Sequence, residues 1–251
     1  MSEFITLFIP FAGTTLGAAM VFLMKDKISP LVEKALLGFA AGVMIAASIW
    51  SLLIPSIDMA EAQGKIAWLP ALIGFALGII FLLVLDTVIP HLHLESDKPE
   101  GVRSKLQKTT MMIFAVTLHN IPEGMAVGLA FALAADGESL AGAFALALGI
   151  GVQNFPEGAA VALPVYQAGK SKRRAFWTGV LSGAVEPLFG ALVVLAAAGI
   201  HALMPWLLSF AAGAMLYVVA EELLPRAGGR RGTCGFLVGF LLMMILDVVL
   251  G

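Results

Sequence analysis

Apolar stretches of about 20 residues recur along nearly the whole of this 251-residue chain. A stretch of that length can cross the roughly 30 Å hydrocarbon core of a bilayer as a helix, in which every backbone polar group finds a partner. The connections between the stretches are too short for a separate soluble domain, so residues 1–251 form a single transmembrane domain in this interpretation. We therefore expect an all-α integral membrane protein with eight transmembrane helices, at residues 4–24, 35–57, 67–90, 110–134, 140–168, 175–199, 206–226 and 233–250.

The composition agrees with a bilayer environment. Hydrophobic residues make up 60% of the chain and charged residues 13%, and the mean hydropathy is +0.97. A soluble domain carries about 25% charged residues. The net charge of −2 argues against a nucleic-acid partner, and a single cysteine, Cys234, excludes a disulfide framework.

The basic residues predict the orientation of the helices. Of the 15 lysines and arginines, all but Lys65 fall in alternate connecting segments. Under the positive-inside rule these segments are cytoplasmic, so both termini are expected on the opposite, extracytoplasmic side. The segments are residues 25–34, 91–109, 169–174 and 226–232.

Internal repeats relate the predicted spans to one another. Spans two and seven share the pattern Phe-Ala-Ala-Gly-x-Met, spans three and eight share Gly-Phe with an aspartate twelve positions after the glycine, and spans four and five share Asn-x-Pro-Glu-Gly. The members of each pair cross in opposite directions. Inverted repeats of this kind are typical of transporters, which bind their substrate near the membrane midplane. The matched segments are 39–44 with 210–215, 74–86 with 235–247, and 120–124 with 154–158.

Acidic residues lie within or at the ends of the predicted spans, where charge is unfavourable. A carboxylate at the bilayer centre costs about 2.5–3.5 kcal/mol even on lenient insertion scales. No lysine or arginine lies deep in a span to neutralise these acids, so a bound cation or a proton is the simplest counter-charge. The residues are Asp86, Glu123, Glu157, Glu186, Glu221, Glu222 and Asp247.

The paired motifs of spans four and five place metal-binding side chains on one helical face. His119 precedes Glu123 by four residues, and Gln153 precedes Glu157 by four, so each pair can hold one ion. Imidazole, carboxylate and amide groups together suit a divalent transition metal such as Zn(II). Glu186 in span six adds a third carboxylate, which could bridge two metal ions together with Glu123 and Glu157.

Prolines within both motifs predict irregular helices at the same depth. Pro122 and Pro156 have no N–H to donate to the preceding turn, so we expect kinks and free carbonyl groups in spans four and five. Such carbonyls are tolerated only beside water, protein or an ion.

Several weaker candidates also have a purely structural explanation. Met44 could offer a thioether to a soft metal, or simply pack in the core. Glu221 and Glu222 could form an exit station for the ion, or sit solvated at the interface. A histidine pair in the longest connection could receive the departing ion, or be an ordinary solvated pair; its members are His91 and His93.

The motifs at 119–124 and 153–158 resemble those of the ZIP family of divalent metal transporters, in its compact bacterial branch. The resemblance implies uptake of zinc into the cytosol through a binuclear site, with cadmium, iron and manganese as competitors. It also implies alternating access, with spans one, four, five and six moving against the others. By position, the first metal would be held by His119, Glu123, Gln153, Glu157 and Glu186, with Met44 as a further candidate. The second would be held by Asn120, Glu123, Asn154, Glu157 and Glu186.

The same resemblance implies a multi-pass protein of the inner cell membrane that is not an enzyme. It would bind divalent metal ions and be surrounded by lipid, and it would need no catalytic cofactor. The protein could be a homodimer. Two positions depart from many relatives, which have histidine at 153 and at 221. The departure at Gln153 bears on metal selectivity, and that at Glu221 bears on release.

Two other functions remain open at this stage. A passive divalent-cation channel could use the same scaffold. An intramembrane metal-dependent hydrolase would use zinc-bound water, but the usual His-Glu-x-x-His pattern is replaced by His-Asn-x-x-Glu at 119–123, and span five has no histidine.

Overall fold

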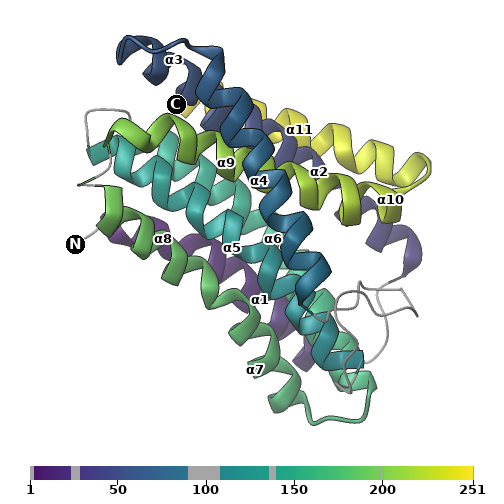
Figure 1. The fold of residues 1–251 in the computed structure, drawn as a ribbon. Helices are drawn as coiled ribbons and strands as arrows, with labels where there is room; N and C mark the ends of the chain where they lie inside the picture. Colours follow the sequence, from purple (N-terminus) through teal and green to yellow (C-terminus); the bar gives the residue numbers. More distant parts are fainter. Residues whose placement is uncertain are drawn as a thin grey trace.

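Helices account for nearly all of the residues that the computed structural model describes, namely 3–23, 29–89, 108–135, 140–197, 199 and 201–250. No strand occurs among these residues (Figure 1). In chain order the elements are η1 Glu3–Phe8, α1 Ile9–Leu23, α2 Pro30–Ala47, η2 Ser48–Leu53, α3 Ile54–Ala62, α4 Trp68–Val88, α5 Lys108–Ala135, α6 Leu140–Gln167, α7 Lys172–Gly183, α8 Val185–Ala197, η3 His201–Leu203, α9 Met204–Val218, η4 Val219–Leu223, α10 Leu224–Ala227 and α11 Arg230–Leu250.

Seven helical stretches in the described part of the chain are long and apolar enough to cross a membrane. The remaining long helix, α6, has 28 residues, or about 42 Å at 1.5 Å per residue. Its polar motif lowers its hydropathy, and its position among α1, α2, α5, α7 and α11 shields that motif from lipid. The predicted all-α membrane architecture is confirmed, whereas the side of the membrane on which the termini lie stays a prediction.

Two groups of helices make up the bundle. In the first, α1 packs against α6 and α7, and α5 packs against α6 and α8. In the second, α2 packs against α11, and α4 packs against α9. In Figure 1 the N-terminus lies at the left at about mid-height, the C-terminus lies at the upper left, and the turn between α10 and α11 lies at the right.

Close helix contacts follow the internal repeat. Gly42 of α2 meets the backbone of Phe236 in α11, and Gly213 of α9 meets the backbone of Phe75 in α4. A Cβ atom at either glycine would overlap the facing carbonyl group. Small residues allow membrane helices to approach this closely. The repeat-related segments therefore make equivalent contacts in the α2–α11 pair and in the α4–α9 pair.

Irregular helical backbone occurs in spans two and seven, as the π-helical segments η2 and η4. Each is followed by a helix with proline at its second residue, Pro55 in α3 and Pro225 in α10. Helices α5 and α6 continue through Pro122 and Pro156 without a break, and the kinks and free carbonyl groups expected there stay a prediction. A single proline deletes only one backbone hydrogen bond, and packing on both sides can hold the helix together.

Lys65, the exception in the charge pattern, has a structural role in the turn between α3 and α4. Its ammonium group donates to Gln63 Oε1 and to the carbonyl of Ala202. Gln63 Nε2 in turn donates to the carbonyl of His201 at 3.1 Å. These bonds tie the α3–α4 turn to η3. They give Lys65 a structural role on the side of the bundle opposite to the other basic residues that the structure describes.

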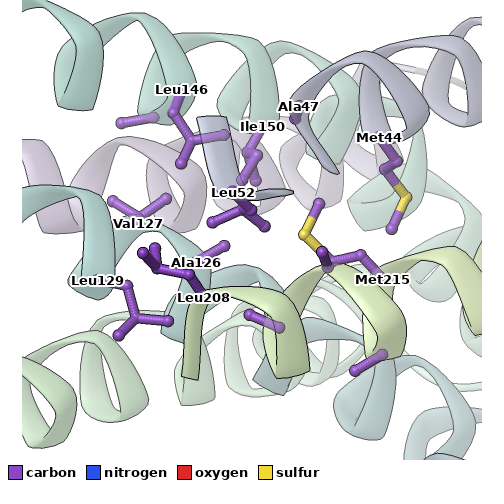
Figure 2. Close-up of a cluster of buried hydrophobic side chains, with 14 of the residues drawn as sticks. Met44, Ala47, Leu52, Ala126, Val127, Leu129, Leu146, Ile150, Leu208 and Met215 are labelled. Carbon is purple, nitrogen blue, oxygen red and sulfur yellow. The ribbon is translucent and has the colours of Figure 1, made fainter. Parts of the chain in front are cut away.

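A cluster of buried apolar side chains lies where the two groups of helices meet (Figure 2). Leu129 and Ile150 enter it from the first group, and Leu208 enters it from the second. Met44 and Met215, which occupy the same position of the repeat, are both fully buried in this cluster. Met44 therefore has the environment of a packing residue in this structure.

Candidate metal centre

The two Asn-x-Pro-Glu-Gly motifs lie near the middle of α5 and α6 and are joined by a direct hydrogen bond. Gln153 Nε2 donates to Glu123 Oε1 at 2.7 Å and to Asn154 Oδ1 at 2.6 Å. All three side chains are buried. The amide of Gln153 thus connects a carboxylate of α5 to α6 at mid-helix depth.

Glu186, near the start of α8, is held by the first helix of the chain. Thr14 Oγ1 of α1 donates to Glu186 Oε1 at 2.8 Å, and both residues are buried. The motif glycines permit this arrangement, because Gly124 lies against the backbone of Glu186 and Gly158 against the backbone of Thr14. A side chain at Gly124 would collide with the backbone of Glu186, and one at Gly158 would collide with the backbone of Thr14.

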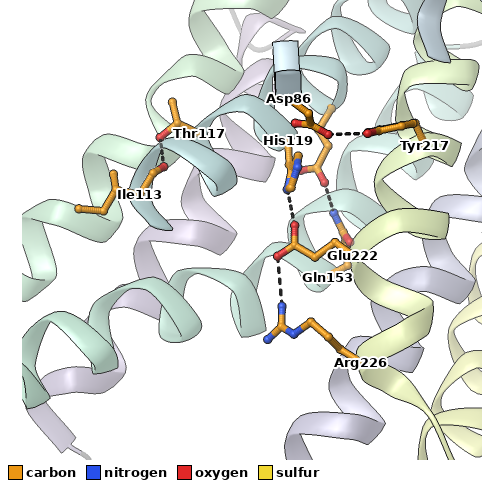
Figure 3. Close-up of polar contacts among 9 residues, drawn as sticks. Asp86, Ile113, Thr117, His119, Gln153, Tyr217, Glu222 and Arg226 are labelled. Carbon is orange, nitrogen blue, oxygen red and sulfur yellow. Dashed lines mark hydrogen bonds and ion pairs between the residues drawn. The ribbon is translucent and has the colours of Figure 1, made fainter. Parts of the chain in front are cut away.

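A chain of contacts between polar side chains leads from the motif of α5 towards the end of the bundle (Figure 3). His119 Nδ1 lies 2.6 Å from Glu222 Oε2. The other oxygen of Glu222 lies 3.2 Å from a terminal nitrogen of Arg226. The second terminal nitrogen of Arg226 lies 3.2 Å from Glu33 Oε1 of α2. His119, from the first helix group, is therefore linked to three residues of the second.

The carboxylates of this region are close enough to repel one another. Glu157 experiences the charges of Glu123, Glu186 and Glu222, and Arg226 offsets part of this repulsion. Several buried oxygens here also have no hydrogen-bond donor in the described part of the chain. They are Asn120 Oδ1, Glu123 Oε2, Gln153 Oε1 and Glu186 Oε2. Buried acceptors in a native structure normally have a partner, so this set is open to a cation.

A cavity of about 480 Å³ enters the bundle from one end and reaches His119 of α5 and Glu157 of α6. Its inner part is lined by His119, Glu157 and Glu222. Its outer part is lined by Glu33 and Arg226 and by residues at the ends of helices, Pro30 of α2 and Gln167 of α6. These helix ends adjoin the basic connections, so the cavity opens towards the side predicted to be cytoplasmic.

No three His, Cys, Asp or Glu side chains within the described residues are arranged closely enough to hold a metal ion as they stand. In this arrangement one oxygen of Glu123 accepts from Gln153 and one oxygen of Glu186 accepts from Thr14. Asn120 likewise uses its amide nitrogen on the carbonyl of Ser182, at 3.1 Å. Binding a metal would require these side chains to move closer together, with Asn120 Oδ1, Glu123 Oε2 and Glu186 Oε2 as oxygens that still lack a donor in the described part of the chain.

The remaining candidates from the sequence differ in their surroundings. Glu222 is buried and lines the cavity, whereas Glu221 is exposed and does not line it. Met44 lies in the apolar cluster of Figure 2. His91 and His93 lie outside the described residues.

The sequence did not predict the hydrogen-bond partners of several polar residues in the bundle. Asp86, one of the acids within or at the ends of the predicted spans, is buried and accepts a hydrogen bond from Tyr217 at 2.6 Å. Asp247 accepts one from Ser51 at the same distance. The role of Thr14 left no signal, since a threonine in an apolar span usually serves helix packing.

The fold and the buried polar residues define a polytopic membrane protein with an internal, negatively charged site connected to one end by a cavity. A model of the family described as "ZIP Zinc transporter" matches residues 91–247. Curated relatives include the zinc transporter GufA of Myxococcus xanthus, 38% identical with 96% of each chain covered. The zinc transporter ZIP11 of Bos taurus is 36% identical, covering 95% of this chain and 94% of the relative. The chain belongs to the ZIP family.

The similarity also extends to a zinc transporter with a longer chain, ZIPB of Bordetella bronchiseptica. It is 38% identical over 250 aligned residues, which cover 96% of this chain and 79% of the relative. The match includes almost all of the present chain, so both motif helices and the helices that surround them fall within the shared region.

Proposed function

We propose that the protein carries divalent transition-metal ions, zinc foremost, across the membrane into the cytosol. The observation that carries this proposal is the set of buried carboxylate and amide oxygens around Glu123 and Glu186 that lack hydrogen-bond donors in the described part of the chain. The names of the relatives, all zinc transporters, support the same metal. The donor set, which combines imidazole, carboxylate and amide groups, also suits zinc.

The ligands are assigned to two adjacent ions. His119, Glu123, Gln153, Glu157 and Glu186 hold the first, and Asn120, Glu123, Asn154, Glu157 and Glu186 hold the second. Three bridging carboxylates offset most of the charge of two divalent ions and leave only a small residual charge, which a site of low dielectric constant requires. Met44 would join the first ion only after leaving the apolar cluster.

The transport cycle is alternating access between the two groups of helices. The cavity that reaches Glu157 and Glu222 corresponds to the inward-open state, with the site accessible from the end of the basic connections. The contact between His119 and Glu222 crosses the boundary between the groups and would break when they slide. The ion binds the inward-open and outward-open states with different affinities, and this difference couples ion binding to the change between the two states.

Uptake of metal by the purified protein in liposomes tests the proposal. Zinc should accumulate in a saturable manner, and excess cadmium, iron or manganese should compete with it. A lack of any divalent-metal uptake by the folded protein would contradict the function. Flux that never saturates with zinc concentration would contradict the carrier mechanism and indicate a passive channel.

A further inference from the structure

Arg226 places a fixed positive charge beside the path by which a metal ion leaves. Its guanidinium group bridges Glu222 of η4 and Glu33 of α2, at 3.2 Å from each. All three side chains line the cavity, and only 11% of the Arg226 side chain is exposed. Arg226 therefore belongs to the wall of the cavity and is not a solvated residue of a loop.

The partners of Glu222 reveal a competition for one carboxylate. One of its oxygens contacts His119, a ligand of the proposed first ion, and the other contacts Arg226. A divalent ion that moves from the central site into the cavity meets this carboxylate next. The guanidinium group already neutralises part of the charge of Glu222, and it repels an approaching dication, so both effects weaken binding there.

We propose that Arg226 acts as a tethered competing cation that prevents the metal ion from being trapped at Glu222 and so speeds its release into the cytosol. Glu33 is the second carboxylate with which the guanidinium group of Arg226 can pair. When the ion occupies Glu222, the guanidinium group can remain paired with Glu33, and it returns to Glu222 when the ion departs. Arg226 is thus a positioning residue, and its role rests on the proposed function.

Steady-state kinetics separate this role from a structural one. In Arg226→Gln the slower release step should lower kcat and KM together, by about tenfold, so that kcat/KM for external zinc is unchanged. Zinc on the release side should inhibit uptake at about tenfold lower concentration. A variant that merely lost folded protein would lower the maximum rate and leave KM unchanged.

Three matched variants complete the test. Arg226→Lys keeps the charge, so kcat and KM should stay within about twofold of the wild-type values. Lysine cannot pair with both carboxylates through two separate nitrogen atoms, as Arg226 does. Glu33→Gln breaks the bridge to α2 but keeps the cation near Glu222, so it should not increase inhibition by zinc from the release side. Arg230→Gln removes the same charge from an exposed position four residues later and should have no effect.

The outcomes are distinguishable from failure of the transport function itself. If Arg226→Gln and Glu33→Gln both lowered the maximum rate without changing KM, Arg226 would be only a brace between α10 and α2, and the inference would be overturned. If the wild-type protein moved no metal, the proposed function would fail first. Wild-type transport together with unchanged kinetics in Arg226→Gln would overturn only the role of Arg226.

Discussion

His119 of α5 and Glu222 of η4 are in direct contact, with 2.6 Å between Nδ1 and Oε2. The two residues belong to different helix groups, and both line the cavity that reaches the motif of α6. The contact therefore joins the proposed metal site to the proposed release path at the boundary where the groups would slide. Each of the following predictions tests one part of this arrangement.

Accessibility of single cysteines should distinguish a carrier from a pore. Leu37 lines the cavity, whereas Ser51, further along the same span, is hydrogen-bonded to Asp247. In a Cys234→Ser background, a thiol reagent on the cytoplasmic side should label Leu37→Cys in the inward-open state, and a reagent outside should label Ser51→Cys in the outward-open state. Conditions that raise labelling at one position should lower it at the other. Labelling that rose and fell together would indicate a continuous pore.

Glu157→Gln should reduce zinc uptake by at least about tenfold, because the amide keeps the size of the side chain but loses the negative charge that balances the ion. Changes to partners of metal ligands already cost roughly 10–100-fold. Initial uptake rates in liposomes, with equal amounts of folded protein, measure the effect. Glu61→Gln, at an exposed position of α3, removes the same charge and serves as the control. Normal uptake by Glu157→Gln would exclude this carboxylate as a ligand.

Gln153→His should shift selectivity towards zinc. Imidazole is a softer ligand than an amide oxygen, so affinity for zinc relative to manganese should rise by about three- to tenfold. The substitution also removes the amide that donates to Glu123 at 2.7 Å. Competition between the two metals in uptake assays gives the ratio. An unchanged ratio would mean that residue 153 does not touch the ion.

Thr14→Val should lower apparent zinc affinity by about tenfold or more while leaving the fold intact. The hydroxyl group donates to Glu186 Oε1 at 2.8 Å, and its loss leaves that carboxylate free to turn away from the metal. Thr14→Ser keeps the donor and should restore affinity. The neighbouring Thr15 has a buried hydroxyl group without a hydrogen-bond partner in the described part of the chain, so Thr15→Val is a matched control. Equal effects of both valine variants would show that the hydrogen bond is not responsible.

Sequence alone predicts the transmembrane helices because their signal is local. A helix in lipid satisfies its own backbone within each turn, so a run of apolar residues is sufficient to specify it. The inverted repeats and the pairing of His119 with Glu123 on one helical face likewise depend only on spacing along the chain. Hydropathy is a weaker signal for α6 than for the other spans, because this helix carries Gln153, Asn154 and Glu157 in its middle. It can do so because other helices enclose it.

Tertiary structure alone decided which polar groups meet. Thr14 and Glu186 are 172 positions apart, and Arg226 and Glu33 are 193 apart, so no spacing rule relates them. Their contacts depend on how closely the helices approach, which is set by glycines such as Gly124 and Gly158 facing particular backbones. The irregular segments η2 and η4 and the burial of Met44 have the same origin. Hydrogen bonds within each helix specify that helix, whereas packing between helices specifies which helices are neighbours. The site is made by side chains from different helices, so only the tertiary structure decides which of them meet.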